Sequence, residues 1–233
     1  MKHAFLTIAL AALAFTAKAQ PEAGRFSIIP RVGVSIANLP GDQIYTLSSS
    51  SDRALSSAYK AGLLAGVDFE YQALPALAVS LGAYYSDQGC RYKDSDVDTS
   101  LKPGKYTAFT RMSTNLKYVN IPLMFSFYAA DNFAIKAGFQ VGVNVDANFK
   151  YTTNDYTRKD DSSVEYKQPT DSKTDLNANK IYMAIPVGIS YEYMNVILDA
   201  RYNIGLGNAF ENDAAFDSRN SVFTISAGYR FTL

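Results

Sequence analysis

The stretch NVILDARYNIGL, residues 195–206, alternates between two kinds of side chain. Every second residue from Val196 to Leu206 is apolar, and the residues between them include Asp199 and Arg201. A period of two is typical of a β-strand, because successive side chains point to opposite faces of the sheet. One face of this strand is therefore apolar throughout, and the other carries a carboxylate and a guanidinium.

The same alternation recurs along the chain, and its segments are long. Eight segments show it: 26–37, 59–71, 77–86, 116–128, 133–147, 181–193, 195–206 and 222–233. Each has about ten to fifteen residues, whereas a strand of a globular protein usually has about five or six. A tilted strand of about 9–11 residues crosses a lipid bilayer. The lengths therefore favour strands that span a membrane.

Two arrangements fit strands with one apolar and one polar face. A soluble barrel or sandwich turns the apolar face inward, whereas a membrane barrel turns it toward lipid and lines its lumen with the polar face. The polar faces here are rich in Gly, Ser and Ala, with a few long charged residues among them. A narrow lumen needs small residues beside large ones, and a surface in water does not. This favours a membrane barrel, in which Leu198 faces lipid and Arg201 faces the interior.

The links between the segments alternate in length. Short links (72–76, 129–132 and residue 194) alternate with long polar links (38–58, 87–115, 148–180 and 207–221). Outer-membrane barrels have short periplasmic turns and longer external loops. The pattern predicts an all-β fold, namely an eight-stranded antiparallel up-and-down transmembrane β-barrel with short periplasmic turns and four long external loops.

Aromatic residues mark one level of this barrel. Near the short-turn end, the apolar faces carry Phe26, Tyr71, Phe127, Phe133, Tyr193 and Phe231. Aromatic side chains from six strands at one height are typical of a girdle at the membrane interface. Candidates for the opposite girdle are Tyr59, Tyr85, Phe149 and Tyr151.

Charged residues of both signs occupy the faces that we expect to line the lumen. They are Arg31, Asp68, Glu70, Lys136, Asp146, Glu192, Asp199, Arg201 and Arg230. One interpretation is a polar network that fills the barrel, since an eight-stranded barrel is only wide enough for its own side chains. The alternative is a gated or selective pore. Within the network, we expect Glu192, Asp199, Arg201 and Arg230 to form one connected cluster in the periplasmic half.

Prolines interrupt three of the predicted strands, at Pro30, Pro122 and Pro186. Proline has no N–H for the ladder, and a closed barrel has no free edge to place it on. Pro122 and Pro186 both follow Ile and both point inward, and we expect local bulges there.

The first residues have the features of an export signal. A basic start precedes an apolar run over 4–17, and the run ends in Ala-Lys-Ala at 17–19, a pattern that signal peptidase cleaves. The alternative, a membrane anchor, needs a longer apolar run. We predict a signal peptide at 1–19 and a single outer-membrane β-barrel domain at 20–233.

Catalysis and metal binding have little support in the sequence. The only histidine is His3, inside the predicted signal peptide, so the mature chain has no histidine to act as a general base or a metal ligand. Cys90 is the only cysteine, so no internal disulfide is possible, and it has no histidine partner. The run Asp-Ser-Asp-Val-Asp at 94–98 lacks the glycine turn and the distal glutamate of a calcium loop. We expect no enzyme activity, no metal and no cofactor.

The balance of charge excludes one class of partner. The chain has 22 basic and 22 acidic residues and no basic tract. A protein that binds nucleic acid usually carries a basic patch or stripe, so we expect no nucleic-acid partner.

The long polar links leave two interpretations open. The stretch 152–175 is dense in both charges and has few aliphatic residues, which fits a mobile surface loop as well as a recognition surface. Tyr106, Tyr151, Tyr156 and Tyr166 would suit recognition, or would extend the barrel above the membrane.

Four stretches resemble a known family. They are PRVGVSIANL at 30–39, KYVNIPLMFSFY at 117–128, with its Ile-Pro step, DARYNIGLGN at 199–208, and SAGYRFTL at 226–233. In these stretches the chain is similar to the PorT-like outer-membrane β-barrel proteins. The resemblance implies an eight-stranded barrel of a Gram-negative envelope, in a family with a few members implicated in secretion or gliding machinery.

The leading hypothesis is a non-enzymatic outer-membrane protein with a structural or interaction role, which includes a subunit of an envelope or secretion assembly. Its expected partners are outer-membrane lipids and either an envelope protein or an extracellular ligand bound through the loops. The alternatives are a small channel or small-molecule-binding barrel, and a soluble lipocalin-like carrier.

Overall fold

The computed structural model describes residues 22–39, 43–45, 54–98, 105–159, 163–210 and 219–233. The strands are β1 (Phe26–Asn38), β2 (Gln43–Tyr45), β3 (Ala54–Leu74), β4 (Leu77–Tyr92), β5 (Ser95–Asp98), β6 (Lys105–Ala130), β7 (Phe133–Arg158), β8 (Val164–Tyr166), β9 (Thr170–Asp175), β10 (Ile181–Tyr193), β11 (Val196–Asn208), β12 (Arg219–Tyr229) and β13 (Phe231–Thr232). The predicted signal peptide lies outside the described residues and stays a prediction.

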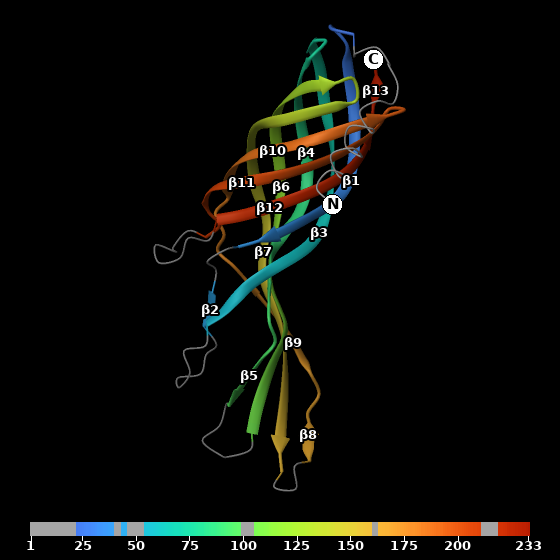
Figure 1. The fold of residues 1–233 in the computed structure, drawn as a ribbon. Helices are drawn as coiled ribbons and strands as arrows, with labels where there is room; N and C mark the ends of the chain where they lie inside the picture. Colours follow the sequence, from blue (N-terminus) through green and yellow to red (C-terminus); the bar gives the residue numbers. More distant parts are fainter. Residues whose placement is uncertain (1–21, 40–42, 46–53, 99–104, 160–162, 211–218) are drawn as a thin grey trace, which may run out of the picture.

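Eight of these strands close into a barrel (Figure 1). In ring order they are β1, β3, β4, β6, β7, β10, β11 and β12, each antiparallel to its neighbours. The ring closes because β1 pairs with β3 on one side and with β12 on the other. Neighbours in the ring follow one another in the sequence, so the predicted eight-stranded up-and-down barrel is confirmed. Closure leaves no sheet edge to face lipid.

Tight turns join the strands at the end where we expected short links. Between β10 and β11 the turn residues are Met194 and Asn195, with φ angles of 48° and 67°. A two-residue hairpin of the type that matches strand twist requires positive φ at both positions. The local backbone therefore sets the register in which Tyr193 faces Val196.

The two faces of the strands divide as expected for a membrane barrel. On the opening stretch, Leu198 is 57% exposed on the outer surface, whereas Asp199 and Arg201 are 3% and 7% exposed. Outward residues of the other strands, such as Phe139 and Ile225, are equally open. A soluble protein would bury this apolar surface, because exposing it to water is unfavourable.

In the described part of the chain, no helix is long and apolar enough to traverse a membrane.

The prolines do not produce the bulges that we expected. Pairing on one side of β6 skips Pro122, and pairing on one side of β10 skips Pro186, but the register is the same before and after each. By that register Pro122 lies opposite Gly82 and Pro186 opposite Gly138. A Cβ at Gly82 would lie 3.2 Å from Pro122 Cγ, so glycine leaves room for the ring. At Pro30 the register between β1 and the β12–β13 strand is likewise unchanged.

On the external side, the structure is more ordered than the loops that we expected. β6 and β7 have 26 residues each and continue well beyond the barrel (Figure 1). β5 pairs with β6, and β8 and β9 pair with β7. Much of the stretch 152–175 is therefore strand. We call β5, β8, β9 and the outer parts of β6 and β7 the external sheet.

The six aromatic residues expected near the short turns lie at that end of the barrel. Five of them are well exposed, and the Phe26 and Tyr71 rings on neighbouring strands are 4.7 Å apart. Phe133 is half-buried. Their assignment to an interfacial girdle remains a proposal.

Candidate functional site

A cluster of five charged side chains fills the middle of the lumen. Asp199 accepts hydrogen bonds from Arg201 Nε at 2.6 Å and from Lys136 Nζ at 3.0 Å. Asp68 accepts one from Arg31 Nε at 2.8 Å and lies 3.5 Å from Arg201 Nη2. Arg31 Nη1 is 3.7 Å from Asp199, which joins the two carboxylates into one network. We call these residues the central cluster.

A second group lies one level closer to the short turns. Arg230 donates to Glu70 at 2.6 Å and forms an ion pair with Glu192 at 3.0 Å. It also donates to the Tyr128 hydroxyl at 3.2 Å. We call Glu70, Tyr128, Glu192 and Arg230 the turn-side cluster.

Among the described residues, no hydrogen bond or ion pair joins these two clusters. The expected connection of Glu192, Asp199, Arg201 and Arg230 into one cluster is therefore wrong. Glu70 and Asp68 are successive inward residues of β3, so they lie at different heights in the lumen. Glu70 pairs with Arg230 and Asp68 with Arg201, which explains the division into two clusters.

The charges of the lumen balance. The two clusters together hold Arg31, Lys136, Arg201 and Arg230 against Asp68, Glu70, Glu192 and Asp199. Burying an unpaired charge costs several kcal/mol, so equal numbers in contact allow these side chains to fill a narrow barrel. Burial is nearly complete in the central cluster, where each side chain is at most 9% exposed.

Asp146 is the one expected lumen residue that lies elsewhere. Lys117 pairs with Asp146 but its neighbour Tyr118 pairs with Asn144, so Val145 is an extra residue in β7. This bulge turns Asp146 to the outer face, where its carboxylate is 2.8 Å from Lys117 Nζ. Strict alternation in the sequence assigns faces as if no residue were extra. In the sheet, the bulge reverses the faces of the residues that follow it.

The pair lies beyond the apolar outer row and is open to solvent. The hydrogen bond from Lys117 lowers the pKa of the Asp146 carboxyl and raises the pKa of the lysine.

The same bulge moves two aromatic residues from the outside to the inside. Phe149 and Tyr151 are candidates for the outer girdle by strict alternation, but both pack against buried residues inside the barrel. Their rings are 5.6 Å apart, and Phe149 is 6.1 Å from Tyr92.

An apolar layer closes the external half of the lumen. Its buried members are Leu39, Cys90, Tyr92, Met112, Leu116, Tyr118, Ala178, Tyr182, Ala184 and Ala209. The rings of Tyr118 and Tyr182 are 5.4 Å apart. The sequence predicted small and polar side chains on the inward faces, and this prediction did not include the apolar layer. The signal was present, because Tyr118 and Tyr182 have the inward parity of their strands.

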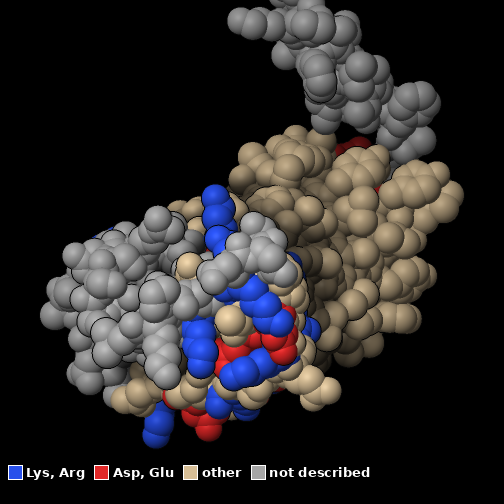
Figure 2. Space-filling model, turned by 90° about the horizontal axis from the view of Figure 1, so that it is seen from below, with Lys and Arg blue, Asp and Glu red and all other residues tan. Residues whose placement is uncertain are grey.

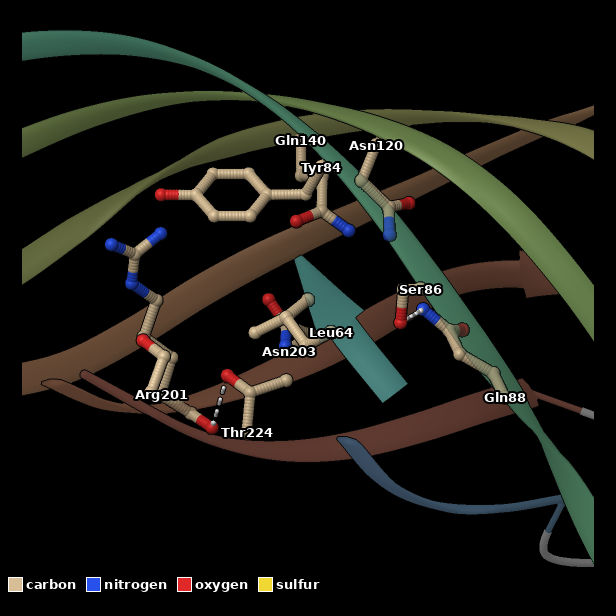
Figure 3. A pocket seen from close by; sticks show the side chains of 10 residues that line it. Leu64, Tyr84, Ser86, Gln88, Asn120, Gln140, Arg201, Asn203 and Thr224 are labelled. Atoms are coloured by element: carbon tan, nitrogen blue, oxygen red, sulfur yellow. Dashed lines mark hydrogen bonds between the residues drawn. The ribbon is translucent and has the colours of Figure 1, made fainter. Parts of the chain in front are cut away.

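The cavity between the layer and the central cluster is very small. Its volume is about 20 Å³, which has room for about one water molecule. Figure 3 shows that Tyr84, Gln140 and Asn120 face Arg201, Asn203 and Thr224 across it. At this level, the described side chains therefore leave little free space in the lumen.

The surroundings of the candidate nucleophile and of the candidate calcium-binding run do not favour either chemistry. Cys90 is fully buried in the apolar layer, with Sγ 3.1 Å from the Tyr92 hydroxyl. Asp94 accepts a hydrogen bond from the backbone N–H of Arg111. The side chains of residues 95–98 lie outside the described part of the structure. Within the described ranges, no group of three or more His, Cys, Asp or Glu side chains is placed to hold a metal ion.

The external sheet carries a ladder of tyrosines. Tyr106, Tyr156 and Tyr166 lie opposite one another on β6, β7 and β8. Their rings are separated by 5.2 Å and 5.8 Å, and the Arg158 guanidinium lies 5.5 Å from the centre of the Tyr106 ring. Tyr166 is 71% exposed. Rigid aromatic rings with a polar tip are common at protein recognition surfaces.

Comparison with known families identifies an outer-membrane family over most of the chain. The family described as outer membrane protein beta-barrel domain matches residues 18–211. Comparison with curated proteins gave no match.

Several solved structures are similar to the chain at low sequence identity. Ail, the attachment invasion locus protein of Yersinia pestis, solved with the heparin analogue sucrose octasulfate, is 13% identical, with 90% of this chain and 100% of that chain covered and a TM-score of 0.42. Neisserial surface protein A is 14% identical, with 88% and 97% covered and a TM-score of 0.38. CarO2 of Acinetobacter baumannii is 16% identical, with 88% and 99% covered and a TM-score of 0.34.

Proposed function

Because the chain belongs to the family of the outer membrane protein beta-barrel domain and is located in the outer membrane, we propose that it is a closed, non-enzymatic barrel that presents the external sheet to a partner outside the cell. The barrel supplies a rigid base. The external sheet supplies the surface that the partner contacts.

The observation that carries this proposal is the contrast between the lumen and the external sheet. The lumen is filled by two charged clusters and an apolar layer, with a cavity of about 20 Å³. A small-molecule site needs a volume of about 300 Å³ or more. The external sheet, in contrast, has ordered strands that the membrane crossing does not require.

Two alternatives lose support. A conducting or ligand-holding barrel needs free volume inside, which the filled lumen does not provide. A soluble lipocalin-like carrier is excluded by the outer-membrane location, and its expected inward apolar face is the outer face here.

The narrower relation to PorT-like barrels is part of the proposal. With it comes a role as one subunit of an envelope or secretion assembly, in which the partner is another envelope protein. The tyrosine ladder supports a protein partner, because tyrosine provides contact area at low entropic cost.

Capture of the partner tests the proposal. The tagged protein is cross-linked in intact cells, extracted in mild detergent, and analysed by native mass and mass spectrometry. We expect a stoichiometric partner with the wild type, and its loss with Tyr106→Ser, Tyr156→Ser and Tyr166→Ser combined.

A change at the opposite end of the barrel provides the control. Met194→Asn in the periplasmic hairpin leaves the external sheet intact and is expected to retain the partner. Equal capture by the wild type and the triple variant would contradict a recognition role for the ladder.

A further inference from the structure

The outer face of β6 continues from the membrane into the external sheet without interruption. Pairing with β4 keeps one register from Phe127, opposite Leu77, to Ser113, opposite Arg91. Because alternation is unbroken, Ser113 and Lys117 lie on the same face as the lipid-facing Val119. Side chains paired with Ser113 therefore project from the barrel wall just outside the membrane.

Three cations and a hydroxyl lie side by side at this level. Ser113 on β6 pairs with Arg91 on β4 and with Lys150 on β7, and Lys150 pairs with Lys173 on β9. Neighbouring strands are about 4.8 Å apart, so four strands place these residues within about 15 Å. Arg91, Lys150 and Lys173 are exposed. We call Arg91, Ser113, Lys150 and Lys173 the basic row.

The basic row has a surplus of positive charge. Among the described residues, neither Arg91 nor Lys150 has an ion-pair partner. Lys173 makes a long contact of 3.6 Å with the exposed Asp175, and its charge also helps to lower the pKa of the Asp146 carboxyl.

Acidic groups near the row are mostly engaged by other cations. Ion pairs join Asp171 to Arg111, Asp146 to Lys117 and Asp87 to Lys60. Figure 2 shows basic and acidic side chains gathered at the external end of the molecule, in front of a barrel wall that is mostly uncharged.

The row lies just above the lipid headgroups. Lys117 is the first charged residue after the apolar row of β6, and Ser113 lies four residues beyond it. Four residues span about 13 Å along a strand, or about 9 Å along the membrane normal at a tilt of about 45°. Headgroup regions extend about 5–8 Å beyond the hydrocarbon on each side. The backbone of the row therefore lies just beyond the headgroup layer, and its long Lys and Arg side chains reach back toward the phosphates at the membrane surface.

We propose that the basic row binds the phosphate groups of anionic lipids in the outer leaflet. Lysine and arginine near a membrane surface attract anionic lipids, and charge-assisted hydrogen bonds to phosphate are strong. The acyl chains of such a lipid would lie along the apolar row below, beside Val119 and Ile121, which are 37% and 44% exposed. Headgroup and chains are thus both matched by one continuous face.

Lipid binding by the protein in neutral detergent tests the proposal. The probe is phosphatidic acid, with phosphatidylcholine as the lipid lacking a free phosphate monoester, and bound lipids are counted by native mass spectrometry. The row variant combines Arg91→Gln, Lys150→Gln and Lys173→Gln. The charge-matched control combines Lys105→Gln, at the start of β6, with Lys159→Gln and Lys167→Gln, which directly follow β7 and β8 away from the row.

We expect the wild type and the control to bind phosphatidic acid in preference to phosphatidylcholine, and the row variant to bind it about tenfold more weakly or worse. Ser113→Glu, which keeps every cation, is expected to weaken binding as well, whereas Ser113→Gln is not. Equal binding by the wild type and the row variant, or an equal loss in the control, would overturn the proposal. Displacement of the lipid by inorganic phosphate at the same concentration would also overturn it, because the site would then be one for free phosphate.

Discussion

Arg201 shows how a single side chain holds the lumen together. Its guanidinium bonds to Asp199 on its own strand and lies 3.5 Å from Asp68, across the barrel on β3. It also lies 5.8 Å from the centre of the Tyr84 ring. The two clusters hold four cations and four anions. Without Arg201, one buried negative charge would lose its compensating cation, in a lumen with little room for water. The importance of this residue therefore follows from burial rather than from the number of its contacts.

We predict that Arg201→Ala destabilises the barrel by about 3–5 kcal/mol, the usual effect of removing one partner from a buried ion pair. The free energy of unfolding, measured by urea titration in detergent micelles or vesicles, gives the change. Because the apolar layer still closes the lumen, Arg201→Ala should not create a conducting channel.

Lys117→Ala provides the comparison, since it also removes a cation from an ion pair, but an exposed one. Its effect on unfolding should be far smaller, because water and salt screen exposed pairs. Similar losses in the two variants would mean that burial does not determine the energy of the central cluster.

At the scale of the strand, a single extra residue decides which side chains face the lumen. Val145 bulges out of β7 and reverses the faces of Asp146, Phe149 and Tyr151 relative to strict alternation. The period of two assigned the membrane-spanning part of each strand correctly, because lipid on one side and a narrow lumen on the other leave no freedom there. Beyond the membrane, both faces meet protein or water, so a bulge carries little penalty and the pattern in the sequence does not reveal it.

We predict that deletion of Val145 is tolerated, because it removes the extra residue and leaves every later residue of β7 on its present face. Deletion of Val141 is the control. It forces the stretch between the deletion and the bulge to shift by one, which turns Val143 inward and Asn144 toward lipid.

Folding of both deletion variants is measured by the difference in electrophoretic mobility between unheated and heated samples. The first should remain mostly folded, and the second should lose folded protein. Equal folding of the two would argue against a bulge at this position.

At the scale of the whole molecule, the barrel is closed at two independent levels. The charged clusters occupy the periplasmic half and the middle, and the apolar layer occupies the external half. A barrel of eight strands leaves space only for side chains, and here the side chains use it fully.

We predict that the wild-type protein produces no stepwise currents in planar lipid bilayers. The double variant Tyr118→Ser and Tyr182→Ser, which opens the apolar layer, should remain silent because the central cluster still blocks the lumen. Flotation of vesicles with folded protein verifies insertion. Regular conductance steps with the wild type would contradict the closed barrel and favour the channel alternative.

The sequence by itself determined the strand count, the ring order, the face of each membrane-spanning residue and the location in the outer membrane. These features follow from local chemistry, because each side chain in the bilayer faces either lipid or the lumen. Each short link can join only neighbouring strands. Only the tertiary structure decided how the inward charges divide into two clusters, that Tyr118 and Tyr182 meet in an apolar layer, and that Arg91, Lys150 and Lys173 form one row. Those contacts join strands far apart in the chain, and their register depends on bulges and on closure of the ring, which no local pattern records.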